Sequence, residues 1–166
     1  MAFRLTSLFT LEAEITSPLD LTTPTSALAV ARQLALAEGA GAGQANMIWS
    51  DTRTINASAT DSLDLAGSLV GPLGGTLTFA RIKMLVVAAA AGNTNNVLIT
   101  RPASNAVPLL SAAANIPVHP GGLFVWYAPS AAGVVVTAGT GDLLDLVNSA
   151  GGTSVTCDVV IVGANA

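Results

Sequence analysis

Hydrophobic and polar residues alternate with a period of two along much of this 166-residue chain, a pattern typical of β-strands. Near the N-terminus, Leu11, Ala13 and Ile15 alternate with two glutamates and a threonine, which predicts a half-exposed strand. Two prolines and an aspartate interrupt the pattern over residues 18–24. We therefore expect an N-terminal strand or arm with a linker over residues 1–25, followed by a single domain over residues 26–166.

Segment 26–37 allows two interpretations. Its alanines, leucines, arginine and glutamine favour a helix, but four large aliphatic residues between positions 28 and 36 all fall on even positions, which favours a strand. We interpret the segment as a strand and keep the helix as the alternative. Three glycines within residues 39–43 predict a loop after it.

Short apolar runs separated by glycine, proline and asparagine continue to the C-terminus. The predicted strands cover residues 47–55, 61–65, 76–87, 97–100, 107–110, 123–127, 134–137, 143–147 and 155–162. Turn signals at a spacing of roughly ten residues predict an all-β fold, an antiparallel β-sandwich or a barrel.

Two segments of the chain resemble each other. Residues 57–65 and 138–146 share an Asp-x-Leu-Asp-Leu pattern, and each is followed by Gly-Gly-Thr and an apolar strand. Two hairpins with the same turn and strand arrangement explain the similarity most simply. A duplication, or equivalent places in two sheets, is the alternative.

The composition excludes several classes of function. Hydrophobic residues make up 51% of the chain and charged residues 10%, but no apolar run reaches the roughly 18 residues of a membrane-spanning helix. The N-terminus lacks the pattern of a signal peptide, so we expect a protein that is not exported by that route. Ten acidic and six basic residues leave no basic patch for nucleic acid.

Residues that would carry catalysis or hold a metal are few. His119 is the only histidine and lies between two prolines before a Gly-Gly turn, which favours a loop position over a catalytic base. Cys157 is the only cysteine and stands in an alternating apolar run, which predicts a small buried residue. We expect no enzyme activity and no cofactor.

Two aspartate pairs have the hard oxygen ligands that calcium prefers. They are Asp61 with Asp64 and Asp142 with Asp145. Neither pair has the dense series of acidic residues found in a calcium loop, and aspartates before a strand commonly accept hydrogen bonds from a turn. We therefore interpret them as turn residues and expect no metal.

Charged residues two positions apart share one face of a strand. Asp51 and Arg53 are expected to form an ion pair or to bond to a neighbouring strand. Arg81 and Lys83 are interpreted as the charged face of an edge strand, with a small cationic contact site as the alternative.

A chain with few charges exposes small and apolar residues, which favours association with other proteins. Aromatic residues are enriched at the centres of interfaces, although for Trp49 we favour a core position. The interface candidates are Leu11, Ala13, Ile15, Trp49, Arg81, Lys83, Trp126 and Tyr127.

The order of the motifs from residue 44 onward resembles a known family. The motifs are Ser50-Asp51-Thr-Arg53-Thr-Ile55, Leu63-Asp64-Leu65-Ala-Gly67, Thr78-Phe79-Ala-Arg81-Ile82-Lys83, Pro120-Gly-Gly122-Leu-Phe124, Val134-Val-Val-Thr137-Ala-Gly-Thr140-Gly-Asp142-Leu-Leu144 and Val159-Val-Ile161-Val-Gly163. This succession is similar to small virion proteins of tailed bacteriophages that resemble capsid decoration, or cement, proteins.

The resemblance implies a jelly-roll-like β-sandwich on the outside of an icosahedral head. It also implies a homotrimer, the major capsid protein as partner, and synthesis in the host cytoplasm before assembly into the virion. From the strand and linker at the N-terminus, we expect residues 1–17 to reach a neighbouring subunit and add a strand to its sheet. The alternatives are another virion component (tail, fibre or baseplate) and a carbohydrate-binding adhesive module, which requires exposed aromatic residues.

Overall fold

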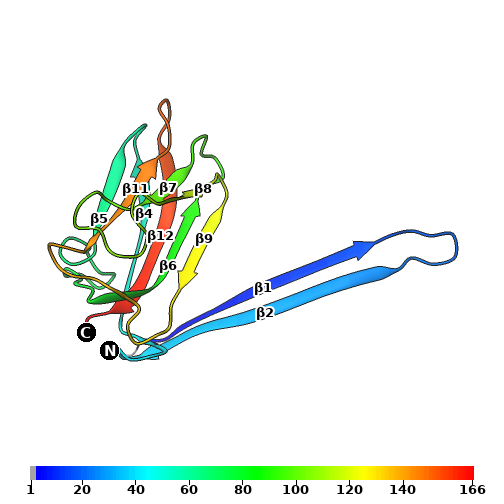
Figure 1. The fold of residues 1–166 in the computed structure, drawn as a ribbon, viewed down its shortest axis with the longest axis horizontal. Helices are drawn as coiled ribbons and strands as arrows, with labels where there is room; N and C mark the ends of the chain where they lie inside the picture. Colours follow the sequence, from blue (N-terminus) through cyan, green and yellow to red (C-terminus); the bar gives the residue numbers. More distant parts are fainter. Residues whose placement is uncertain (1–2) are drawn as a thin grey trace.

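Residues 3–166, which the computed structural model describes, form twelve strands and no helix (Figure 1). The prediction of an all-β fold is confirmed, and segment 26–37 is a strand. The strands are β1 (Leu5–Thr16), β2 (Thr25–Glu38), β3 (Gln44–Ala45), β4 (Met47–Ile55), β5 (Thr60–Asp64), β6 (Arg81–Ala89), β7 (Val97–Thr100), β8 (Asn115–Val118), β9 (Leu123–Tyr127), β10 (Val134–Val135), β11 (Leu143–Asn148) and β12 (Val155–Ala164).

The strands from β4 onward form two antiparallel sheets. The larger sheet has the order β10-β6-β12-β4, with β9 also paired to β6, and the smaller sheet has the order β5-β11-β7-β8. One hydrophobic core contains buried residues of both sheets, among them Leu85 of β6, Ile161 of β12 and Leu146 of β11. Alternate residues of β11 are buried, as the period of two predicts for a strand with one face on the core.

Strands β1 and β2 form a long antiparallel hairpin that projects from the rest of the molecule (Figure 1). The pairing runs without interruption from Leu5–Leu36 to Thr16–Thr25. Residues 18–24, expected to be a linker, are therefore the loop that joins the two strands, and the expected boundary at residue 25 falls inside the hairpin. A short segment with two prolines is compatible with a linker or with the loop of a hairpin. It is a hairpin loop here because the strand that follows it pairs with the strand that precedes it.

Other expectations about strands also differ from the structure. Residues 76–80, expected to begin a strand over residues 76–87, lie before β6, which starts at Arg81. Residues 107–110 form a turn, with a single bridge at Ala106. The strand in this region is β8, which contains Pro117 and lies at the edge of its sheet. A proline lacks the N–H that a central strand needs but is tolerated at an edge, so the proline in this segment was a poor indicator of a turn.

The two similar segments of the sequence pair with each other. Strands β5 and β11 run antiparallel, with Leu63 opposite Leu144 and Ser62 opposite Asp145. In the larger sheet β6 pairs with β12, β10 flanks β6 and β4 flanks β12. If β4, β5 and β6 trade places with β10, β11 and β12, respectively, the same set of these strand pairings results. The similar segments therefore occupy equivalent positions in one sheet, and the idea that they lie in two sheets is wrong.

Candidate functional site

The hairpin has one apolar face and one polar face, because paired residues of an antiparallel ladder point to the same side. The apolar face carries Leu5, Phe9, Leu11, Ala13, Ile15, Leu28, Val30, Leu34 and Leu36. The opposite face carries mainly threonine, alanine and glutamate. The alternation that predicts a strand at residues 11–15 thus continues across both strands and generates a two-stranded apolar surface.

The base of the hairpin packs on the outer face of the larger sheet. Leu36 is buried with Met84 of β6 and Val162 of β12, and Leu34 packs against the same cluster. The hydroxyl of Tyr127 donates a hydrogen bond to the carbonyl of Ala35 at 2.9 Å. These contacts fix the root of the hairpin and set the direction in which it leaves the two sheets.

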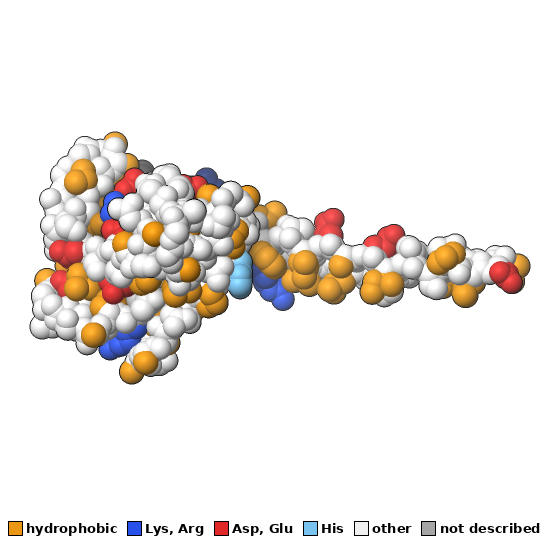
Figure 2. Space-filling model, turned by 90° about the horizontal axis from the view of Figure 1, so that it is seen from above, with side chains coloured by type: hydrophobic (Ala, Val, Ile, Leu, Met, Phe, Trp, Pro, Cys, Tyr) orange, Lys and Arg blue, Asp and Glu red, His pale blue; other side chains and the backbone are white. Residues whose placement is uncertain are grey.

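Beyond its base, the apolar face of the hairpin is uncovered. Leu11 is 45% exposed, Leu28 53% and Ile15 76%. Figure 2 shows hydrophobic side chains along the length of the projecting hairpin, with acidic side chains standing out from it. A contiguous apolar surface of this kind is typical of a site that contacts another molecule.

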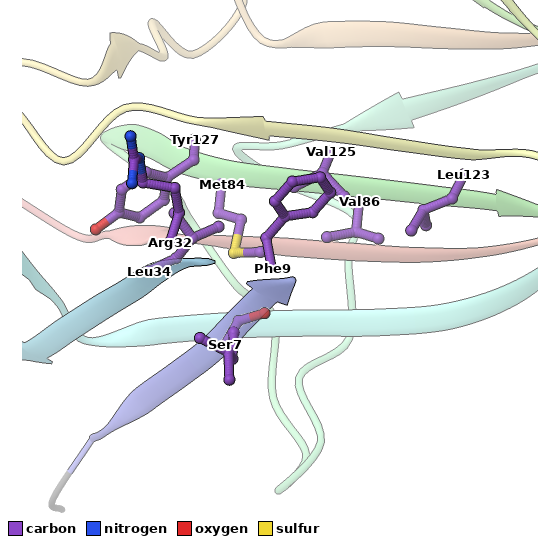
Figure 3. Close-up of a pocket in the computed structure, with 10 residues that line it drawn as sticks. Ser7, Phe9, Arg32, Leu34, Met84, Val86, Leu123, Val125 and Tyr127 are labelled. Carbon is purple, nitrogen blue, oxygen red and sulfur yellow. The ribbon is translucent and has the colours of Figure 1, made fainter. Parts of the chain in front are cut away.

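An apolar groove of about 640 Å³ lies between the hairpin and the larger sheet (Figure 3). Phe9 and Arg32 of the hairpin face Val86 of β6 and Leu123 and Val125 of β9 across it. Leu123 is 65% exposed and Val125 44%. The outer face of the sheet therefore continues the apolar surface of the hairpin.

This groove was not predicted from the sequence, although β9 contains a signal for it. All five residues of β9, Leu-Phe-Val-Trp-Tyr, are apolar or aromatic. A strand with only one covered face alternates apolar and polar residues, so a continuous apolar strand indicates contacts on both faces. Phe124 and Trp126 pack against the core, whereas Leu123 and Val125 line the groove.

The interface candidates fall in different places. Leu11, Ala13 and Ile15 lie on the apolar face of the hairpin, and Tyr127 lies at its root. Trp49 is buried in the core, in agreement with the position we favoured for it, and Trp126 is half-buried against the same core. Four of the eight candidates therefore lie on the hairpin or at its root, spread along its length.

The prediction that Arg81 and Lys83 form the charged face of an edge strand is wrong. Strand β6 pairs with β12 on one side and with β9 and β10 on the other, so it lies inside the sheet. Lys83 is fully buried, and its ammonium donates hydrogen bonds to the carbonyls of Ala40 and Gly41. Arg81 is half-buried and donates to the carbonyl of Ala131 at 2.7 Å. Burial and the nearby Arg81 lower the pKa of Lys83.

The ion pair predicted between Asp51 and Arg53 is confirmed, at 2.9 Å. Arg53 also makes two hydrogen bonds, at 2.6 and 2.8 Å, to the carboxylate of Asp61. Because Arg53 belongs to β4 and Asp61 to β5, this contact joins the two sheets at one edge. The two carboxylates raise the pKa of Arg53 above its ordinary value.

The aspartate pairs act in turns and between strands. Asp64 accepts a hydrogen bond from the backbone N–H of Ala66 at 3.0 Å, and Asp142 accepts one from Gly139. Asp145 accepts a hydrogen bond from Ser62 on the neighbouring strand. The role expected for aspartates near turns is thus confirmed for Asp64 and Asp142.

Other candidate chemistry is sparse in residues 3–166. Their acidic, histidine and cysteine side chains form no group of three that would hold a metal ion. His119 is exposed in the loop between β8 and β9. Cys157 is buried, as predicted, and burial raises the pKa of its thiol to about 11.

Comparison of the chain with known protein families, with curated proteins and with solved structures gave no match. Within the described part of the chain, no helix has the length and apolar character needed to cross a membrane. The hairpin and its groove are therefore the features of the molecule that bear most directly on its function.

Proposed function

We propose that this chain is a structural virion protein, a decoration or cement protein that binds the outside of a tailed-bacteriophage head. The observation that supports the proposal most directly is the projecting hairpin, which has an apolar face that its own chain leaves uncovered. A surface of this kind fits a protein that acts through permanent contacts with other proteins. The resemblance of residues 44–166 to phage decoration proteins points in the same direction.

In this proposal, the two antiparallel sheets are a jelly-roll-like β-sandwich and the hairpin is its N-terminal arm. The partners are the major capsid protein and further copies of the chain, with a homotrimer as the favoured assembly. The protein is made in the host cytoplasm and resides on the capsid surface. Its contribution is mechanical, since it joins neighbouring capsid proteins and carries out no reaction.

The proposal is tested by locating the chain in assembled particles. Gold-labelled antibodies raised against the purified chain are applied to particles of the phage that encodes it, and the particles are viewed by electron microscopy. Label spread over intact heads is the expected result. Label confined to tails, fibres or baseplates would replace the proposal with one of those virion roles, and particles without label would overturn a virion role altogether.

The carbohydrate-binding alternative requires exposed aromatic residues that stack on sugars. Among residues 3–166, Phe9 is the aromatic side chain with an exposed fraction above one half, at 56%, and it lies in the groove. A screen of the purified chain against an array of glycans provides the comparison. Reproducible binding that is lost in Phe9→Ala would favour the adhesive module over the decoration protein.

A further inference from the structure

We propose that the uncovered apolar face of the hairpin packs into the groove of a second copy of this chain, so that copies exchange their hairpins. This inference deepens the proposed function, because it names a partner for the same surface. It differs from the addition of a strand to a neighbouring sheet, since the contact is made by the face of the hairpin and not by its edge.

Each chain contains both halves of such a contact. The apolar face of the hairpin runs along both strands, interrupted by Ser7, Arg32 and Ser26, and at its base it is covered by Met84 and Val162 of the outer sheet face. Farther out the hairpin lacks a cover, while the same sheet face continues to the exposed Leu123 and Val125. The outer sheet face that covers the base of the hairpin is thus apolar beyond that contact as well, as a cover for the outer half of a hairpin must be. In an assembly of identical copies, each hairpin has one such sheet face available on another copy.

The available area favours exchange over a single contact. From the Phe9–Arg32 pair to the Thr16–Thr25 pair, the hairpin is about 24 Å long and about 10 Å wide at ordinary strand spacings. One docked face then removes roughly 240 Å² from each partner, or about 480 Å² in total, which lies in the range of crystal contacts. In a two-fold dimer, in which each copy both gives and receives a hairpin, two such contacts form one interface of about 960 Å², close to the roughly 1,000 Å² of a stable interface.

The charges of the two surfaces are complementary. Between residues 10 and 31 the hairpin carries Glu12, Glu14 and Asp20 and no basic residue. The groove holds Arg32, which is exposed and donates a hydrogen bond to the carbonyl of Ala31, with no ion pair to any residue of the described chain. Because Glu12 and Glu14 lie on the face opposite the docked one, their attraction to this guanidinium group acts over a longer distance and favours the approach of two copies, not a contact inside the groove.

A two-stranded hairpin has little stability by itself in water. The outer parts of β1 and β2 pair with no third strand of the described chain, because β3 pairs with β2 only at Ala37 and Glu38. A cover over the apolar face would supply the burial that the hairpin lacks. A second copy provides this cover even before any capsid is present.

The first test measures the oligomeric state of the purified full chain by sedimentation velocity and light scattering. The variant Leu11→Thr/Val30→Thr changes one cross-strand pair on the apolar face and keeps side chains that favour strands. We expect the wild-type chain to form a closed oligomer and the variant to dissociate at concentrations at least about tenfold higher. The matched control is Ala29→Thr/Ala31→Thr on the opposite face, which should assemble as the wild type does.

The second test locates the contact. Chains with Val30→Cys and, separately, Val125→Cys are given different mass tags, mixed and oxidised; the native Cys157 is buried and does not compete. We expect disulfide-linked pairs that contain one chain of each kind, and fewer of them when Ala31→Cys replaces Val30→Cys. Each variant is also oxidised alone. Linked pairs in the Val30→Cys sample then report contacts between two hairpins.

Three results would overturn the inference: a wild-type chain that stays monomeric at high concentration, an oligomer that tolerates Leu11→Thr/Val30→Thr, or cross-links only between two copies of Val30→Cys. Because these measurements use the chain alone, their failure leaves the particle-labelling result unaffected. Conversely, unlabelled phage heads would refute the virion role while leaving an exchanged oligomer in place.

Discussion

At the scale of single residues, a few buried polar side chains connect loops that the strands alone would leave free. Asn148, at the end of β11, is 2% exposed. Its amide group donates to the carbonyls of Asn56 at 3.1 Å and Thr153 at 2.8 Å, and its oxygen accepts from Asn95 at 3.0 Å. The side chain thus links the turn after β4, the turn before β12 and the loop before β7.

Replacing Asn148 by alanine should destabilise the fold by about 2–3 kcal/mol, because several backbone carbonyls lose their donor in a buried place. Urea unfolding followed by circular dichroism measures the change in the free energy of unfolding. Asn115→Ala, at an exposed position of β8, is the matched control and should change it by less than about 0.5 kcal/mol. Equal effects of the two variants would contradict a structural role for Asn148.

The buried thiol of Cys157 makes stability depend on pH in the alkaline range. Its pKa is about 11 in the folded chain against an ordinary 9.0, so above pH 9 the unfolded chain releases this proton first. The stabilising contribution is complete below pH 9 and is lost as the pH rises to about 11, with a total of about 2–3 kcal/mol. Unfolding measured from pH 8 to 11 should show a steeper loss of stability for the wild type than for Cys157→Ala.

Local sequence patterns predicted some of these residues and could not predict others. Asp51 and Arg53 are two positions apart on one strand, so their ion pair follows from strand geometry. Lys83 shows the same spacing to Arg81 but is buried, because β6 lies inside its sheet and a glycine loop covers the ammonium. The order of strands in a sheet depends on contacts between distant segments, which a local pattern does not contain.

At the scale of elements, the pairing of β6 with β12 depends on one glycine. The register of the two strands shifts between Val162 and Gly163. A Cβ atom at Gly163 would lie 2.1 Å from the carbonyl oxygen of Arg81 and 2.8 Å from the ring of Phe79. The bulge therefore requires a residue without a side chain where the two backbones approach each other.

Gly163→Ala should destabilise the protein by about 1–3 kcal/mol, because a backbone atom must move to accept the methyl group. Gly92→Ala is the matched control, since no atom lies within 4 Å of the added Cβ. Thermal unfolding of the two variants beside the wild type gives the comparison. A Gly163→Ala protein as stable as Gly92→Ala would show that the bulge adapts without cost.

The period of two predicted most of the strands, including β2, where residue propensities favoured a helix. It failed where proline was taken as a turn signal, because Pro117 lies in the edge strand β8. It also left the hairpin undetected, although the two halves have the same alternation and matching lengths. A comparison of the apolar positions on either side of residues 18–24 would have indicated the shared face of β1 and β2.

At the scale of the whole molecule, the two sheets bury their apolar faces against each other, whereas the hairpin leaves most of its apolar face exposed. The two sheets enclose their own core, and the two strands with similar sequences, β5 and β11, pair with each other in the smaller sheet. The hairpin departs from this arrangement, and its most exposed large hydrophobic side chains, Leu21 and Ile15, lie at and near its tip. In the exchange proposed above, the hairpin gains its cover from a second copy of the chain.

This division predicts that the hairpin and the sheets differ in their dependence on protein concentration. Amide hydrogens of residues 8–31 should exchange rapidly in dilute solution, where a lone hairpin opens easily, and slow by about tenfold or more when the chain is concentrated enough to assemble. Amides of β12, in the middle of the larger sheet, are the internal control and should exchange slowly at every concentration. Hydrogen exchange read by mass spectrometry separates the two regions, and equal protection of the hairpin in dilute and concentrated samples would show that it is stable without a partner.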